Sequence, residues 1–246
     1  MVEAKCIGRD EKQSICAQRD ASRREPLNNG QWQALVALHR QLIHEHLDFF
    51  LASQPPSARC NLSRLAAKYT MPARMWRHGI HAFLEVLRHR LQESLEHMLA
   101  LLYVAYSLMA LLVETVSTFE DTWIECLGHL GRHRMAIEDD EPKDCDIWTG
   151  VARFWYRKAA DRITVIGYLH HHLAILARPY TLEQLSLYIQ SLTYASPLES
   201  ARGSMKTLFE PTLSGREAAY HRSLSMEPVT TKAHGPLFSF PKGPTL

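Results

Sequence analysis

Cationic side chains gather on one predicted helix before the middle of the chain. Four of them recur at helical spacing after Pro72 and fall on roughly one face: Arg74, Arg77, His81 and Arg88. Arg90 lies nearby, and Glu85 is the acidic residue that opposes them. Because guanidinium groups bind phosphate through parallel hydrogen bonds, this face would suit a nucleic-acid backbone or a phosphoserine. An ordinary solvated helix face is the alternative reading.

Three consecutive histidines, His170, His171 and His172, draw attention as metal ligands. Neighbouring positions on a helix point about 100° apart, so three in a row cannot ligate one ion. No second cluster stands at zinc-ligand spacing. The acidic run over 138–146 lacks the glycine and alternate ligands of a calcium loop. We therefore expect no metal and no cofactor.

Catalytic motifs are missing from the sequence. It contains no Gly-x-Ser-x-Gly elbow, no glycine-rich phosphate loop and no His-Glu-x-x-His. We predict that the protein is not an enzyme and has no small-molecule substrate. The five cysteines have no Cys-x-x-Cys pair, which argues against a zinc knuckle or a disulfide framework. Such cysteine use is typical of the nucleus or cytoplasm.

The overall charge is mildly basic. The 246 residues carry a net charge of +2, with 14 histidines not counted, and 46% are hydrophobic. These values are ordinary for a globular protein. They neither require nor exclude nucleic acid, because a local basic patch matters more than the total charge.

Helical periodicity fills the chain between two ends that lack it. Residues 1–29 mix charges of both signs and predict a disordered leader. Residues 211–246 are rich in proline and predict a flexible tail. The residues between them, 30–210, predict one helical domain. Strand-like alternation is almost absent, so the expected fold class is all-α.

Three long helices are predicted in the first half. One starts near Trp32, with Asn28 or Asn29 as its cap. The second starts near Pro72, which suits a first helical turn. The third runs from about Ser94 to Val116 and is apolar all round, so we expect it to be buried in the middle of the fold. Its apolar core is too short for a membrane span, and no membrane is expected.

Later helix starts are predicted by a hydroxyl followed three residues later by Glu or Gln, the pattern of a capping box. The pairs are Ser117 with Glu120, Thr181 with Gln184, and Ser196 with Glu199. Asp146 is predicted to cap the helix after the acidic run.

The helices after Trp123 are short and paired. Small and aromatic residues recur in two of them, Tyr156 with Ala159 and Tyr188 with Ser191, at close to the period of about 34 residues of tetratricopeptide repeats. Small residues let two helices approach while the aromatic ring fills the groove beside them. Generic packing in a helical bundle would explain the same pattern.

Several segments together resemble the fungal DNA/RNA-binding domain of the Est-one/SMG type, the family of telomerase subunits and nonsense-mediated-decay factors. The run 123–134 is similar to its Leu-Gly-Asp-x-x-Arg-Tyr-Arg signature, and 75–78 to its Leu-Trp-x-x-His segment. The stretch 155–160, then Gly167, then 168–177 is similar to its Tyr-Tyr-x-x-Ala, Gly, Leu-Ala-Ile-Leu series. The match covers about 70–210, and the domain could be truncated.

The resemblance implies a 14-3-3-like helical array that contains tetratricopeptide hairpins. It places Arg132 and Arg134 at the two arginines that face a phosphate-binding groove, and Arg77 or His81 at the basic residue of an earlier helix. His133 stands where the family has tyrosine, and His129 where it has aspartate. These departures put phosphate specificity in doubt.

The function expected on this basis is a nucleic-acid-binding adaptor for RNA or DNA, of the telomere-maintenance or nonsense-mediated-decay type. One alternative is a tetratricopeptide module that binds a protein partner, phosphorylated or not. A degenerate, truncated paralogue is the other.

Overall fold

The computed structural model describes residues 7–8, 10–15, 28–55, 57–137 and 142–213. The chain forms two compact units, Met1–Leu130 and Gly131–Leu246. The boundary between the two units, after Leu130, falls inside a helix. Each unit is therefore described separately.

Helices make up both units, and the predicted all-α class is confirmed. The first unit contains α2 (Asn29–Ser53), α3 (Cys60–Lys68), α4 (Met71–Arg74), the π-helix η1 (Met75–His81), α5 (Ala82–His89), α6 (Leu91–Thr115), the 3-10 turn η2 (Ser117–Phe119) and most of α7 (Glu120–Met135). The second contains α8 (Pro142–Arg162), α9 (Tyr168–Leu176), α10 (Thr181–Thr193) and α11 (Ala201–Leu213). Among the described residues, Ile166 and Ser196 form an isolated bridge rather than a strand.

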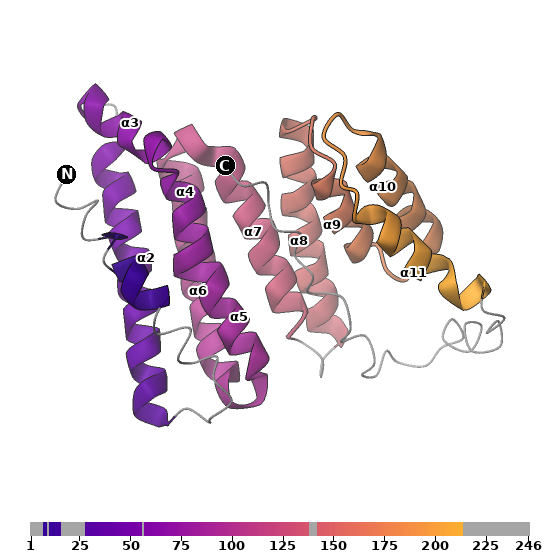
Figure 1. Ribbon diagram of the computed structural model, residues 1–246, viewed down its shortest axis with the longest axis horizontal. Helices are drawn as coiled ribbons and strands as arrows, with labels where there is room; N and C mark the ends of the chain where they lie inside the picture. Colours follow the sequence, from indigo (N-terminus) through magenta and orange to yellow (C-terminus); the bar gives the residue numbers. More distant parts are fainter. Residues whose placement is uncertain (1–6, 9, 16–27, 56, 138–141, 214–246) are drawn as a thin grey trace. The chain divides into compact units, whose positions relative to one another are not determined.

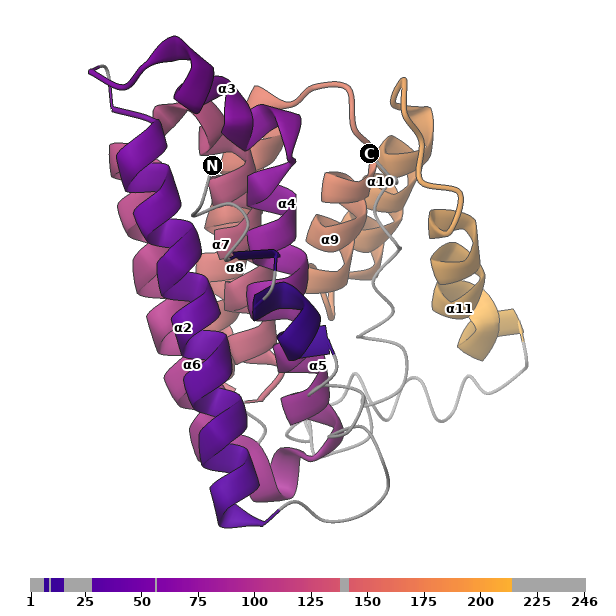
Figure 2. The same cartoon turned by 60° about the vertical axis from the view of Figure 1, so that its left-hand side comes forward.

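In the first unit, α2, α6 and the continuous α4–η1–α5 segment run side by side (Figures 1 and 2). Helix α2 starts as predicted. The Asn28 side chain accepts a hydrogen bond from the Gln31 amide at 2.8 Å, and the Gln31 side chain accepts one from the Asn28 amide at 2.9 Å. The inner face of α2 buries Trp32, Leu42 and Phe50.

Loss of this cap should weaken α2. We expect Asn28→Ala to lower the free energy of unfolding by about 1 kcal/mol, because the first amides of the helix lose their acceptor. Urea unfolding followed by circular dichroism measures the change. Gln33→Ala, an exposed position inside the same helix, is the control and should have almost no effect.

The segment after Pro72 is helical, as predicted, but it contains a π-helix. Its wide turn brings residues five apart together, so the Trp76 and His81 rings lie 5.9 Å from each other. Gly79 faces α2, where an added Cβ would lie 3.3 Å from Ile43 Cγ1. The missing side chain therefore lets the two helices approach closely.

Helix α6 spans the predicted residues, but the prediction that it is buried in the middle of the fold is wrong. Tyr103 is 76% exposed, and Leu95 and Leu111 are also exposed. The reason is that α6 packs on α2 and α5 along one side, which leaves its other side uncovered. In the described part of the chain, α6 is the helix long and apolar enough to cross a membrane, judged by length and composition alone.

In the second unit, α8, α9, α10 and α11 each pack against the next helix in sequence. Tyr156 and Ala159 are buried in α8, and Tyr188 and Ser191 in α10. These are the residues that sequence periodicity placed at helix contacts. Gly131 approaches α8 closely, since an added Cβ would lie 3.2 Å from the Ala152 backbone.

The three predicted capping boxes agree with the structure to different degrees. Helix α10 starts at Thr181, as predicted, but Tyr180 is in the N-cap position. Ser117 begins a 3-10 turn that leads into α7 at Glu120, and α11 starts at Ala201, five residues after Ser196. Helix α8 starts at Pro142, so Asp146 lies inside it and is not its cap. The Gln184 side chain makes a contact between helices instead, since it donates to the Ala174 carbonyl of α9 at 3.2 Å.

Part of the expected leader is helical. Residues 7–8 and 10–15 form helical turns that lie against α2 and the α4–α5 segment (Figures 1 and 2). Ile7, Glu11 and Ser14 are buried there. At the other end, α11 continues through Pro211 to Leu213, past the predicted start of the tail. The rest of the leader and the residues from 214 onward lie outside the described residues.

Candidate nucleic-acid-binding surface

Arg77 is the most accessible of the predicted cations on the segment after Pro72. Its side chain is exposed on η1. In the part of the chain that the structure describes, no carboxylate pairs with it, unlike Arg74 and Arg88. Arg77 therefore presents its charge to solvent.

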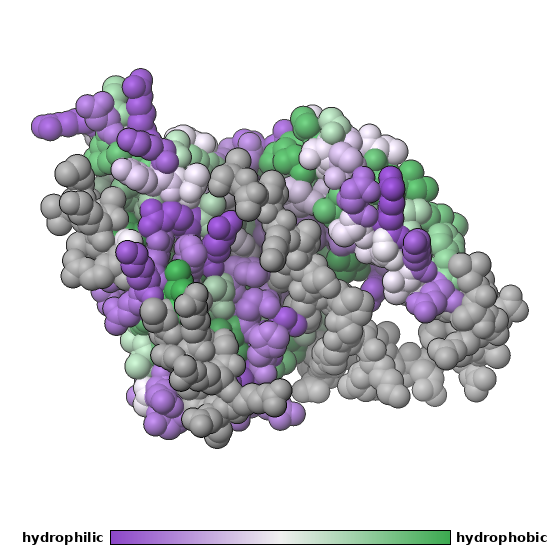
Figure 3. Space-filling model, in the orientation of Figure 1, coloured by the Kyte–Doolittle hydropathy of each residue, from purple (hydrophilic) through white to green (hydrophobic). Residues whose placement is uncertain are grey.

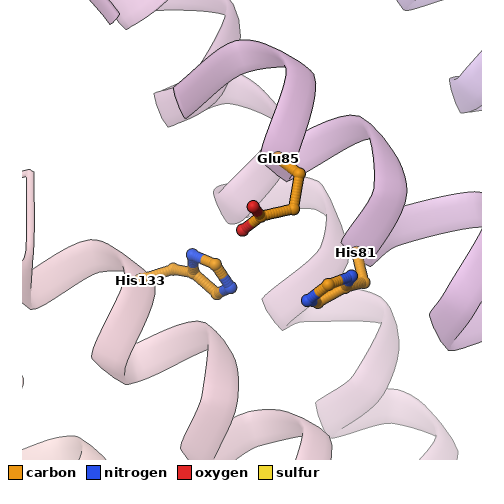
Figure 4. A group of neighbouring side chains, drawn as sticks. All are labelled: His81, Glu85 and His133. Carbon is orange, nitrogen blue, oxygen red and sulfur yellow. The ribbon is translucent and has the colours of Figure 1, made fainter. Parts of the chain in front are cut away.

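Arg88 and His81 have local partners. Arg88 donates to Glu85 Oε2 at 2.8 Å, one turn earlier on the same helix. His81 and Glu85 project from the same side of this segment, while His133 belongs to α7 (Figure 4). Glu85 thus pairs with Arg88, one of the cations that it was predicted to oppose.

Arg74 pairs with Glu11, a residue of the predicted disordered leader. Its Nε donates to both carboxylate oxygens of Glu11, at 3.0 and 3.1 Å, and its Nη2 also contacts Glu11. The π-helix adds a second change. A π-turn holds more residues than an α-turn. Arg74 and Arg88 lie on either side of the π-helix, so they do not share the helix face that regular α-helical spacing predicts for them.

Three more cations lie on or beside α3. Arg59, Arg64 and Lys68 are all exposed, and hydrophilic side chains stand out at α3 among more hydrophobic ones (Figure 3). Tyr69 follows, with 44% of its surface exposed, and Lys68 Nζ lies 5.7 Å from the centre of its ring. Helix α3 contacts α4, which leads directly into η1. We call Arg59, Arg64, Lys68, Tyr69 and Arg77 the α3–η1 surface.

This surface has a signal in the sequence that motif comparison missed. No aspartate or glutamate occurs between Asp48 and Glu85. A stretch with several cations and no carboxylate has no local partner to neutralise it, so its field reaches the solvent. An exposed aromatic ring among cations is also the usual way in which proteins hold unpaired bases.

The residues at the family's aspartate and tryptophan positions contact each other. The rings of His129 and Trp76 stack with their centres 5.3 Å apart. His129 Nε2 also lies 3.2 Å from Glu125 Oε1, one turn earlier on α7. Glu125 therefore supplies a carboxylate to this region, although position 129 itself holds a histidine.

The signature residues at the end of α7 belong to the second unit. Arg132 is 4% exposed and His133 is 1% exposed, so neither lies on the open surface. Arg132 lowers the pKa of His171 on α9, although burial of His171 is the larger cause. The Arg134 guanidinium lies 5.5 Å from the Trp148 ring centre, and burial lowers its pKa while Asp144 raises it.

The three consecutive histidines are core residues of the second unit, and each faces a different neighbour. His170 stacks on Tyr194 at 4.5 Å between ring centres. His171 Nε2 lies 3.1 Å from the Ser204 hydroxyl, and His172 stacks on Tyr156. Burial lowers the pKa of His170 and, with Arg132, brings that of His171 to about 4.

Two buried histidines of α2 were also missed by sequence reasoning. His39 Nδ1 donates to the Gly79 carbonyl at 3.1 Å, which leaves Nε2 to accept from the Ser14 hydroxyl at 3.2 Å. His46 Nδ1 donates to the Leu42 carbonyl at 2.8 Å. Burial lowers the pKa of His39 to about 4, and the Gly79 hydrogen bond only partly opposes this.

Comparison with known proteins gives one informative match. No family model matches the chain. Over 170 residues the chain is 25% identical to EST/SMG-like protein 2 of Saccharomyces cerevisiae. The matched region is 67% of this chain but only 14% of the yeast protein, so the chain spans a small part of that relative. The similarity supports a distant relationship between this chain and the yeast EST/SMG-like protein.

Proposed function

We propose that this chain is a non-enzymatic adaptor that binds single-stranded RNA or DNA through the α3–η1 surface. The observation that carries the proposal is the group of exposed cations around Tyr69 in a stretch without carboxylates. Cations would follow the phosphate backbone, and the tyrosine ring would stack on a base. The distant relationship to an EST/SMG-like protein supports a role in telomere maintenance or nonsense-mediated decay.

The choice of single strands follows from the size and chemistry of this surface. One exposed aromatic ring offers a stacking platform that a base inside a duplex cannot use. The four cations of this surface would contact phosphate oxygens, so contacts would go mostly to the backbone. Binding should therefore be tolerant of sequence and strongly dependent on salt.

Charge reversal on α3 tests the proposal. Fluorescence anisotropy with single-stranded RNA and DNA should show that Arg64→Glu/Lys68→Glu weakens binding at least about tenfold. For the wild type, four phosphate contacts predict a slope of about −3 for log affinity against log salt, and the variant should show a shallower slope.

A matched control exists on α11. Arg202 and Lys206 are also an exposed Arg/Lys pair one helical turn apart, so Arg202→Glu/Lys206→Glu changes the net charge equally. This control should bind nucleic acid much more tightly than the α3 variant. Equal losses from both double variants would assign the binding to net charge alone. A wild-type affinity no better than that of a mixed-charge control protein would refute nucleic-acid binding.

A further inference from the structure

A buried carboxylate of the N-terminal helix is surrounded by cations of the first unit. Glu11 is 7% exposed. Arg74 grips both of its oxygens, and His46 Nε2 lies 3.4 Å from Oε1. Since His46 Nδ1 already donates to Leu42, only the doubly protonated ring can also donate to Glu11. An arginine and a histidine from different helices thus lie against one carboxylate.

These cations favour the ionised form of Glu11 in a place where burial does not. Burial by itself raises the pKa of Glu11, but its hydrogen bonds to His46 and Arg74 outweigh this, and the pKa lies below its ordinary value. His78 also interacts with this charge. Burial lowers the pKa of His78, and Glu11 opposes this by raising it. The neighbouring cations Arg77, Arg74 and His46 lower it further. The site therefore selects for negative charge.

Two further carboxylates, Asp10 and Glu45, interact with each other near His46. Burial raises the pKa of Glu45, and Asp10 raises it further. Asp10 belongs to the same N-terminal helix as Glu11, so both acids would leave together if this helix undocked. Four cationic or protonatable groups would then remain, namely Arg74, Arg77, His46 and His78, opposed by Glu45.

We propose that Arg74 and His46 form an anion-binding site for a phosphate group, and that Glu11 occupies this site as an internal substitute. A carboxylate and a phosphate present similar pairs of oxygens to the planar guanidinium fork. The N-terminal helix therefore competes with phosphate for Arg74. Arg77, which belongs to the α3–η1 surface, lies three residues after Arg74 in the sequence. Docking of the N-terminal helix would therefore limit the phosphates that the surface can reach. That the phosphate comes from a nucleic-acid backbone rests on the proposed function.

Neutralising the internal carboxylate should open the site. Binding of inorganic phosphate to the full chain, measured by calorimetry at constant ionic strength, should be at least about tenfold tighter for Glu11→Gln than for the wild type. The second variant, Glu11→Gln/Arg74→Met, should lose this gain. Glu93→Gln removes an exposed carboxylate of α6 and gives the same change in net charge, so it should resemble the wild type.

The outcomes separate this site from the proposed function. If Glu11 only holds the N-terminal helix in place, Glu11→Gln loses stability without gaining phosphate binding, and the inference is overturned. The same holds if Glu93→Gln gains equally. A second arm uses single-stranded RNA, for which Glu11→Gln should bind about tenfold tighter than the wild type. Phosphate binding without any RNA binding would support the anion site and refute the proposed function.

Discussion

Gly167→Ala is expected to destabilise the second unit by about 3 kcal/mol or more. An alanine Cβ at this position would lie 2.1 Å from the Ser191 carbonyl oxygen and 3.2 Å from that of Ser196. Both are backbone atoms, so no side chain can turn aside to make room. The Gly167 amide also donates to the Ser196 carbonyl at 2.9 Å, which ties the two segments together.

The φ angle of Gly167 is −74°, which any residue adopts, so space rather than backbone freedom requires glycine here. Chemical unfolding followed by circular dichroism measures the effect. Gly150→Ala is the control, because an added Cβ on this residue of α8 meets nothing within 4 Å. Helix propensity should make that variant more stable by up to about 1 kcal/mol. A Gly167→Ala protein as stable as the wild type would contradict the described packing of α9 against α10.

Acidification from about pH 6.5 to pH 4 is expected to reduce stability by about 3 kcal/mol through His39 alone. Burial among Ser14, Gly79 and Phe83 lowers its pKa to about 4, from an ordinary value of 6.5. In this window the unfolded chain binds a proton that the folded chain does not. The contribution is therefore complete above pH 6.5 and is lost as the pH falls toward 4.

Other groups act in the same direction. His171 has a pKa of about 4 and should destabilise the second unit over the same window. The lowered pKa of Glu11 means that its contribution is present above 4.5 and is lost at lower pH. Acid should therefore loosen both units, through different residues.

The share of His39 is isolated by comparison with His39→Asn, whose amide can still donate to the Gly79 carbonyl. This variant should be less stable at pH 7 but should lose less stability on acidification. His89→Asn, at an exposed position of α5, should follow the wild-type profile. Parallel pH profiles for the wild type and His39→Asn would show that His39 titrates like a solvated histidine.

The candidate site was only partly readable from the sequence. Local patterns identified Arg77 and the opposition of Glu85 to the basic helix, because residues three or four apart on one helix meet whatever surrounds them. They did not identify Glu11 as the partner of Arg74, since that pair joins two helices far apart in the sequence. The cations of α3 lie outside the family motifs, and their signal is the absence of acidic residues between Asp48 and Glu85.

The fold shows the same division between local and long-range information. The sequence by itself determined the all-α class, the start of α2 at Asn28 or Asn29 and a helix after Pro72, because hydrophobic periodicity and capping act within a few residues. Only the tertiary structure decided that Tyr103 of α6 is exposed, that the three consecutive histidines lie in a core, and that Gly167 must lack a side chain. Each of these depends on which helices pack against one another. Hydrophobic periodicity shows how apolar a helix face is, but it does not show which element covers that face.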